Sequence, residues 1–159
     1  MKQIKEPIIS VYIVNKNYDK FLKQAIKSVL SQSFQSKELI IIDDGSSDLS
    51  KEIIEKYKKK NLCRVIYNKS SKGLIKSSNI AIKIARGEYV IRLDADDYLD
   101  SNALSVLYDK ISKEKNVALV YSDYYLIDSK NNILSLEKQI LRKNTKLNHL
   151  PVLAACCLI

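Results

Sequence analysis

The sequence predicts an α/β protein with an open, mostly parallel β-sheet and helices on both faces of that sheet. Short apolar segments rich in β-branched residues alternate four times with segments that carry apolar residues at helical spacing. The strand-like segments have no regularly polar side, as expected for strands covered on both faces. The length of 159 residues, with 46% hydrophobic and 28% charged residues, suits one globular unit. We therefore expect residues 1–159 to form a single domain.

The first two strand–helix units occupy the N-terminal third of the chain. The segment 8–14 is β-branched or aromatic and almost wholly apolar, and a helical stripe of apolar residues follows it over 21–30. A second buried strand is expected over 39–42, and it ends in acidic residues. Asp48 precedes apolar residues at helical spacing over 53–57, so we expect it to cap that helix.

The next two units follow the same pattern, and a hairpin comes after them. The expected segments are, in order, a strand over 63–67, a helix over 74–85, a strand over 89–93, a helix over 103–111 and a strand over 117–127. Gly87 is expected to close the third helix, and Asp100 to cap the fourth. Residues 130–132 are typical of a turn that leads into Ile133 and Leu134. The alternation favours right-handed βαβ units.

Charge and composition exclude several classes of function. The net charge of +9 would suit an anionic partner, but the lysines are dispersed, and their single tight run, 58–60, has no interleaved aromatic residues. We therefore expect no nucleic-acid partner. The three glycines are far apart, which excludes a glycine-rich dinucleotide loop and a P-loop. The three cysteines form no metal-binding pair, as expected in a reducing compartment.

The ends of the chain indicate a cytoplasmic protein. The polar N-terminus leads directly into a strand and does not resemble a signal peptide. The apolar tail over 150–159 is too short to span a bilayer.

Polar residues follow three of the expected strands at the edge where ligands bind in open α/β sheets. These are residues 15–17, 43–48 and 94–97. In the last group, Asp94, Asp96 and Asp97 would repel one another unless a cation lies among them. Oxygen ligands favour Mg²⁺ or Mn²⁺, so we expect Asp94 and Asp96 to bind metal or nucleotide.

Two acidic residues end the second strand. Asp43 or Asp44 could accept a hydrogen bond from a uracil imide or from a ribose hydroxyl, whereas Asp48 and Ser47 are better explained by helix capping. We expect one residue of the pair Asp43 and Asp44 to contact the nucleotide.

Three motifs in this order resemble the nucleotide-binding half of family 2 glycosyltransferases. They are ISVYIVNKN (9–17), ELIIIDDGSSD (38–48) and NKSSKGLIKSSNIAIKIARGEYVIRLDADD (68–97). The resemblance covers residues 8–128 and implies a Rossmann-like GT-A fold. It also implies base contact for Asp43 or Asp44, nucleotide contact for Asp94 and metal coordination by Asp96. Asn15 matches a position that commonly touches the nucleotide.

The chain departs from the family pattern in several places. Many members have Arg-Asn where this chain has Ser78 and Asn79, and Lys76 is the nearest substitute for the basic residue. Arg92 replaces a residue that is usually apolar. The acceptor-binding half of the family, which carries the catalytic base, has no counterpart, so we expect a truncated domain. We also expect the apolar tail to favour a dimer.

The resemblance implies an inverting, metal-dependent transferase. It would transfer a sugar from a nucleotide-sugar donor, expected to be a UDP-sugar, to a saccharide or lipid-linked acceptor, as in bacterial surface polysaccharide synthesis. Peripheral contact with the inner face of the plasma membrane would follow. Asp123 is a weak candidate for the base. The alternative is a non-catalytic module that binds a nucleotide sugar. A phosphoacceptor signalling domain is disfavoured, because Asn68 stands where its acceptor Asp is needed.

Overall fold

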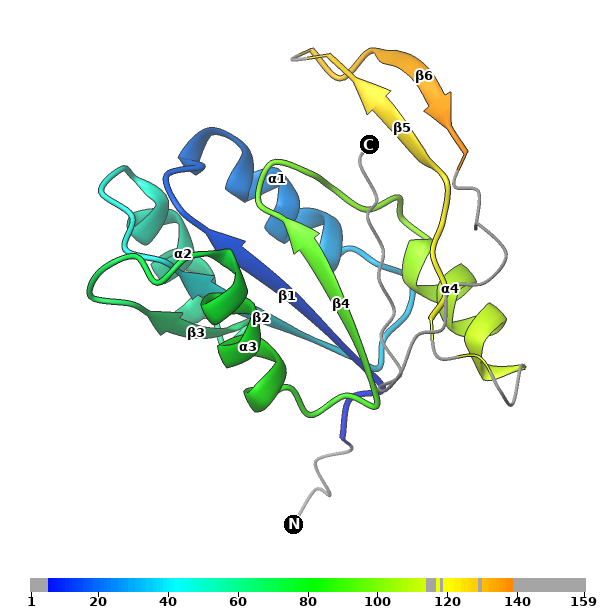
Figure 1. Cartoon of the computed structure of the whole chain (residues 1–159), viewed down its shortest axis with the longest axis horizontal. Coiled ribbons are helices and arrows are strands. Elements are labelled where there is room, and N and C mark those ends of the chain that lie inside the picture. Colours follow the sequence, from blue (N-terminus) through cyan, green and yellow to red (C-terminus); the bar gives the residue numbers. More distant parts are fainter. Residues whose placement is uncertain (1–5, 114–116, 118, 129, 139–159) are drawn as a thin grey trace.

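Four parallel strands form the main sheet, in the spatial order β3–β2–β1–β4 (Figure 1). The computed structural model describes residues 6–113, 117, 119–128 and 130–138. The strands of this sheet are β1 (Ile9–Asn15), β2 (Lys37–Asp43), β3 (Arg64–Tyr67) and β4 (Tyr89–Asp94). The first three strands follow one another outward, and the chain then crosses back to place β4 on the other side of β1. The strand order therefore reverses between β1 and β4, and ligands bind at such switch points.

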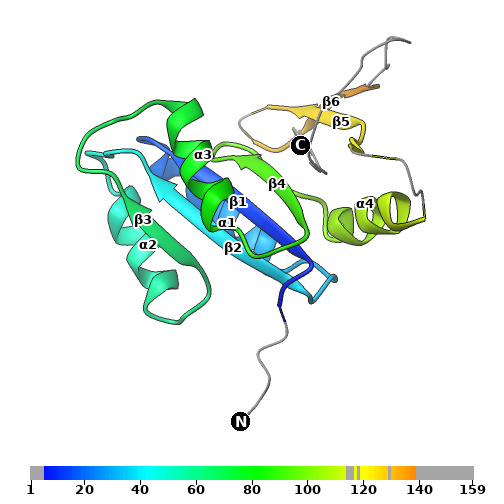
Figure 2. The same cartoon turned by 60° about the horizontal axis from the view of Figure 1, so that its bottom comes forward.

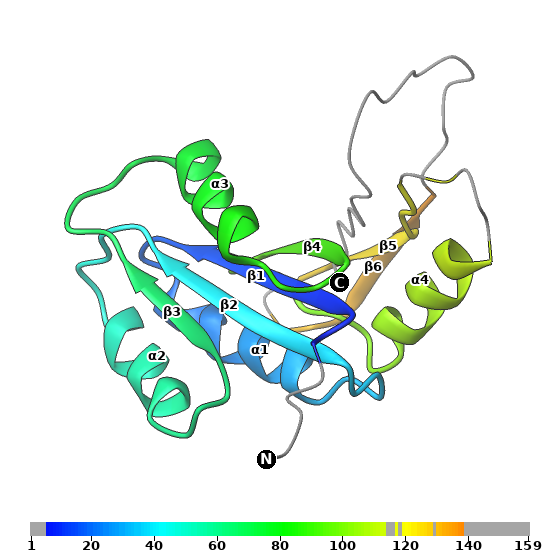
Figure 3. The ribbon, with the colours of Figure 1, turned by 90° about the horizontal axis from the view of Figure 1, so that it is seen from below.

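Helices cover both faces of this sheet (Figure 3). They are α1 (Asp19–Leu30), α2 (Ser50–Lys58), α3 (Leu74–Ile84) and α4 (Ala103–Ser112). In β1, Ile9, Val11 and Ile13 pack with residues of α1, α2 and α4, whereas Tyr12 packs with Ala81 of α3. Successive side chains of a strand point to opposite faces, so the largely apolar residues of β1 serve two cores. The predicted fold class is confirmed.

The register brings the ends of three strands to one edge of the sheet. Asn15 pairs with Asp43 across β1 and β2, and Val14 pairs with Asp94 across β1 and β4. The polar residues that follow these strands therefore lie side by side, although Asn15 and Asp94 are 79 positions apart in the sequence. This edge is the one where the sequence predicts ligand binding.

The strands β5 (Tyr124–Ile127) and β6 (Ile133–Glu137) form a separate antiparallel hairpin. It lies beside β4 and α4 and apart from the main sheet (Figure 2). The Asp128 carboxylate accepts hydrogen bonds from the backbone N–H groups of Lys130 and Asn132 and so closes the turn. The predicted hairpin is confirmed.

The strand predicted over 117–127 is too long. Only Tyr124–Ile127 of this segment is a strand, and the described residues between 117 and 123 pair with none of the strands that the structure describes. β-Branched and aromatic residues alone do not make a strand where no partner strand offers hydrogen bonds. The apolar tail over 150–159, from which the dimer is predicted, lies outside the described residues. Within the described part of the chain, no helix is long and apolar enough to cross a membrane.

The helix caps predicted at Asp48 and Asp100 are wrong, because the N-cap residues of α2 and α4 are Leu49 and Asn102 and neither makes a side-chain capping hydrogen bond. Asp48 and Asp100 lie one and two residues before these N-caps and bond nearby backbone N–H groups instead. The Asp48 Oδ1 atom accepts the backbone N–H of Ser50 at 3.0 Å, at the start of α2. The Asp100 Oδ1 atom accepts the backbone N–H of Asn102 at 3.1 Å, just before α4. These contacts satisfy N–H groups that have no partner inside the helix.

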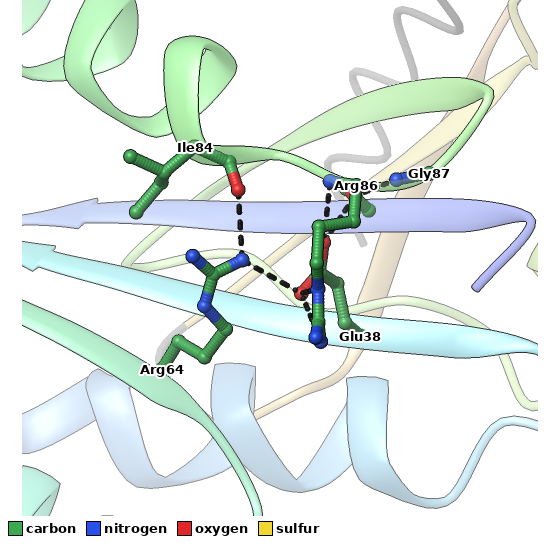
Figure 4. Close-up of polar contacts among 6 residues, drawn as sticks. Glu38, Arg64, Ile84, Arg86 and Gly87 are labelled. Carbon is green, nitrogen blue, oxygen red and sulfur yellow. Dashed lines mark hydrogen bonds and ion pairs between the residues drawn. The ribbon is translucent and has the colours of Figure 1, made fainter. Parts of the chain in front are cut away.

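An ion cluster around the buried Glu38 side chain lies at the opposite edge of the sheet, where the strands begin (Figure 4). The Glu38 carboxylate accepts hydrogen bonds from Arg64, from Arg86 and from the Ser10 hydroxyl. The Arg64 guanidinium also donates to the Ile84 carbonyl at 2.7 Å. The cluster joins β1, β2, β3 and the segment after α3, so its role is to hold the sheet together.

Candidate functional site

A pocket of about 530 Å³ opens at the carboxyl edge of the sheet, where the strand order reverses. We call it the switch-point pocket. It is lined by residues that follow β1, β2 and β4 and by residues at the start of α3: Val14, Lys16, Tyr18, Asp44, Ser71, Gly73, Leu74, Asp94, Ala95 and Asp96. Its volume lies within the range of about 300–1,000 Å³ typical of small-molecule sites.

Asp44 lies in the wall of this pocket and is only 2% exposed. Its Oδ1 atom accepts hydrogen bonds from Asn68 Nδ2 at 2.7 Å, from Ser77 Oγ at 2.8 Å and from the Lys72 N–H at 2.9 Å. Its Oδ2 atom accepts from Ser71 Oγ at 2.6 Å and from the Gly73 N–H at 3.0 Å. Five donors use the full acceptor capacity of a carboxylate. Asp44 therefore organises the loop that begins α3.

The same contacts explain the ionisation of Asp44. Burial alone would raise its pKa, but hydrogen bonds from Ser71, Lys72, Asn68 and Ser77 outweigh burial and hold the pKa of the carboxyl far below its usual range. The residue is a fixed negative charge at neutral pH.

Asn15 and Asp43 are fully buried and lie behind the pocket wall. Asn15 Nδ2 donates to Asp43 Oδ1 at 3.1 Å and to Ser46 Oγ at 3.0 Å, and the Ser46 N–H donates to Asp43 Oδ2 at 3.3 Å. These bonds tie the loop after β1 to the loop after β2. Neither residue is among those that line the switch-point pocket, so the predicted contacts of Asn15 and Asp43 with a nucleotide stay predictions.

Asp94 and Asp96 line the pocket at the end of β4 and differ in their partners. Asp94 forms an ion pair with Arg92, with Nε to Oδ1 at 3.0 Å and Nη2 to Oδ2 at 3.1 Å. Asp96 is exposed and has no hydrogen-bond or ion-pair partner among the residues that the structure describes. Asp96 is therefore the carboxylate most available to a cation.

The carboxylates of the described residues suit a metal ion that is coordinated largely by the phosphates of a bound substrate and only in part by the protein. No group of three or more His, Cys, Asp or Glu side chains converges within that part of the chain. Mg²⁺ commonly keeps several waters and binds one or two carboxylates together with substrate phosphates. Asp94 and Asp96 supply such a pair beside a pocket large enough for a nucleotide.

Two other predicted residues lie away from the pocket lining. Lys76 is exposed in the first turns of α3, and Asp123 is exposed immediately before β5. The pocket takes its cation from Lys16, in the loop after β1, which the sequence analysis did not single out. Its position directly after a buried strand is the signal that could have identified it.

Asp97 is the second residue that the sequence analysis left without a role. It is 8% exposed, and burial raises its pKa to about 7, with added effect from the charges of Asp96 and Asp94. It lines a second pocket of about 450 Å³, which lies against the β5–β6 hairpin. Asp96 lines both pockets.

Comparison with known proteins identifies relatives along most of the chain. A sequence model of the family described as Glycosyl transferase family 2 matches residues 10–159. Glycosyltransferase GlyG of Streptococcus pneumoniae serotype 4 is 34% identical over 122 residues, which are 76% of this chain and 40% of that protein. Cholesterol galactosyltransferase of Borreliella burgdorferi is 40% identical over 118 residues, and chondroitin synthase of Escherichia coli is 31% identical over 129. The chain spans 33% and 19% of their lengths, respectively.

Comparison with solved structures also identifies proteins whose fold is similar to that of this chain. S. aureus TarS 1–349 in complex with UDP matches with a TM-score of 0.66 and 29% identity, over 72% of this chain and 35% of that one. GalNAc-T7 with UDP, GalNAc and Mn²⁺ matches with a TM-score of 0.66 and 27% identity, over 84% of this chain and 25% of that one. Because the family match extends from residue 10 to residue 159, the chain belongs to glycosyl transferase family 2.

Proposed function

We propose that this chain forms the donor-binding part of an inverting, metal-dependent glycosyltransferase that uses a UDP-sugar. The observation that carries the proposal is the switch-point pocket, with Asp94 and Asp96 on one side and the loop organised by Asp44 on the other. The proposal is supported by family membership and by two structural relatives described as complexes with UDP.

Each part of the pocket would contact a different part of the donor. The base and ribose would lie against the loop that Asp44 holds, near the backbone of Ser71 and Gly73. Lys16 would offset the charge of the diphosphate. Charge developing on the leaving diphosphate would also be offset by Mn²⁺ or Mg²⁺, which Asp96 would hold with help from Asp94.

In an inverting reaction, an acceptor hydroxyl attacks the anomeric carbon and the nucleoside diphosphate leaves from the opposite face. The hydroxyl proton must pass to a base, for which Asp123 is the candidate from the sequence. The acceptor would be a saccharide or a lipid-linked saccharide, a proposal supported by relatives named chondroitin synthase and cholesterol galactosyltransferase. Such an enzyme would act at the inner face of the plasma membrane.

Titration calorimetry with UDP tests the donor and metal assignments together. We expect binding in the presence of Mn²⁺ and a large loss of affinity when EDTA replaces the metal. Asp96→Asn should abolish this metal dependence, with a loss of at least the roughly 10- to 100-fold that even outer-shell changes cause at metal sites.

Asp100→Asn is the matched control, because it makes the same chemical change four positions away and the side-chain oxygen of Asn can still accept the N–H of Asn102. It should leave UDP affinity unchanged. Equal affinity with and without metal in the wild-type chain would refute the metal assignment, and equal behaviour of the two variants would refute the role of Asp96.

A further inference from the structure

The outward side of α3 is both apolar and basic. This helix lies on one face of the main sheet, whereas α1 and α2 lie on the other (Figure 3). Its inward side packs through Ala81 on Tyr12, Ile40 and Ile42 of the sheet. The exposed residues of the helix form what we call the α3 face: Leu74, Ile75, Lys76, Asn79, Ile82 and Lys83.

Large apolar side chains are unusually exposed on the α3 face. Ile75 is 77% exposed, more than any other large hydrophobic residue in the described part of the chain, and Leu74 and Ile82 are 47% and 42% exposed. Ile75 and Ile82 are seven positions apart, which is close to two helical turns, so they lie on the same side of the helix. Single exposed apolar residues are normal on a protein surface, whereas a row of them along one helix indicates a partner.

Basic residues border this apolar row. Lys76 and Lys83 each directly follow one of the two exposed isoleucines, so the lysines form a second row beside the first. Lys69 and Lys72, which precede the helix, are exposed as well. Residues 56–87 contain ten Lys and Arg residues and no Asp or Glu. The α3 face therefore presents an apolar row with positive charge beside it.

This combination selects the partner by its chemistry. A basic amphipathic helix is typical of binding to a membrane surface, where apolar side chains enter the boundary between headgroups and acyl chains. A second copy of this chain would bring an equally positive face against the first and would be repelled. Single-stranded nucleic acid is bound largely through aromatic side chains that stack on its bases, and α3 has no aromatic residue.

We propose that the α3 face docks on an anionic lipid surface, with its isoleucines inserted among the headgroups and its lysines paired with lipid phosphates. Gly73 and Leu74, at the start of α3, line the switch-point pocket. A docked α3 therefore holds that pocket close to the headgroups, within reach of a substrate anchored in the same surface. This last consequence rests on the proposed function, whereas the binding to lipid rests on the α3 face alone.

Co-sedimentation of the full chain with vesicles, in the absence of UDP, measures this binding. The vesicles contain phosphatidylcholine and anionic phosphatidylglycerol in about a 2:1 ratio. Binding should be at least about tenfold weaker to vesicles of phosphatidylcholine alone, because each Lys near an anionic surface contributes roughly fivefold in affinity. Added salt should weaken binding to the mixed vesicles, because it screens this attraction.

Two variants test the two rows of the α3 face. Ile75→Ser should weaken binding to the mixed vesicles by about tenfold, because it removes an inserted apolar side chain. Its control is Val106→Ser on α4, where the side chain is 59% exposed. Lys83→Gln should weaken binding by about fivefold. Its control is Lys27→Gln, which makes the same change in net charge at an exposed position of α1.

The controls should bind the mixed vesicles within about twofold of the wild type. The proposal is overturned if the wild-type chain does not bind mixed vesicles, or binds phosphatidylcholine vesicles equally well. It is also overturned if Ile75→Ser and Lys83→Gln weaken binding no more than their controls, since the attraction would then belong to the +9 chain as a whole. Binding of a single-stranded oligonucleotide in place of vesicles, lost in Lys83→Gln, would assign the face to nucleic acid instead.

Calorimetry with UDP and Mn²⁺ on the same preparation separates this proposal from the proposed function. Vesicle binding without UDP binding would refute the proposed function alone. UDP binding without vesicle binding would refute the docking of the α3 face alone.

Discussion

Asp44 and Asp97 are both buried carboxylates at the same edge of the sheet, and their surroundings differ completely. Asp44 accepts five hydrogen bonds, whereas Asp97 has no such partner in the described part of the chain. In the sequence, each is simply the second acidic residue of a pair after an apolar strand. Their difference depends on the loop at 68–73, which reaches Asp44 from a distant part of the chain. Sequence patterns therefore locate such carboxylates without revealing their roles.

Asp97 should make stability fall as pH rises. An unfolded Asp has a pKa of about 3.9, and the folded value is about 7, so the folded state holds a proton that the unfolded state has lost between these values. The contribution of Asp97 to stability should therefore be highest below about pH 4 and decline until about pH 7. Asp97→Asn removes this contribution, and its stability relative to the wild type should rise by about 2 kcal/mol between pH 5 and pH 8.

Urea unfolding of both chains at several pH values, in EDTA, measures this difference. Other groups contribute equally to the two chains and cancel. A stability difference that does not change between pH 5 and pH 8 would show that Asp97 titrates normally in the folded state.

At the scale of elements, the sequence predicts the main sheet and its helices closely. The expected strand over 89–93 is observed as Tyr89–Asp94, and the expected helix over 74–85 as Leu74–Ile84. These segments are predictable because each has a clear hydrophobic period and lies within the sheet or directly against it. The segment 117–127 is mispredicted because, among the described strands, its strand propensity meets no partner before Tyr124.

Glu38 shows how a single charged residue links several elements. It lies near the start of β2, its side chain is 7% exposed, and it bonds residues of β1 and β3 as well as Arg86. Burial would raise its pKa, but hydrogen bonds from Ser10, Arg86 and Arg64 outweigh burial and lower the pKa. The sequence analysis found no role for it, since its partners Arg64, Ser10 and Arg86 lie 26, 28 and 48 positions away in the sequence.

Glu38→Gln should destabilise the chain by about 2 kcal/mol. Breaking a fully buried pair costs about 3–5 kcal/mol, but the side chains of Arg64 and Arg86 are 40% and 46% exposed, so water can partly replace the lost charge. Urea unfolding at pH 7 measures the change. Glu52→Gln, on the exposed surface of α2, is the control and should stay within about 0.5 kcal/mol of the wild type. A similar small effect for Glu38→Gln would refute the structural role of the cluster.

At the scale of the whole molecule, the site depends on contacts that no local pattern contains. Strand alternation predicts that Asp44 and Asp94 meet at one edge, and the register confirms that β1, β2 and β4 end there. The division of that edge into two pockets that share Asp96 depends on how the hairpin packs against α1. Gln24 Nε2, for example, donates to Asn131 Oδ1 across 107 positions of sequence at 3.4 Å.

The hairpin should open far more easily than the main sheet. Residues 9–14 of β1 pair with strands on both sides, and β1 lies between two apolar clusters, whereas β5 and β6 pair only with each other within the described residues. Leu126, Ile133 and Leu134 are 41%, 63% and 66% exposed, so the hairpin loses little buried apolar area when it opens. An isolated two-stranded hairpin is at best marginally stable in water.

Native-state hydrogen exchange measures this difference residue by residue. Amides of β1 should exchange only with global unfolding, and those of β5 and β6 should exchange through local opening with a free energy lower by at least about 2 kcal/mol. Equal protection of the hairpin and β1 in the ligand-free chain would show that the two sheets unfold as one cooperative unit.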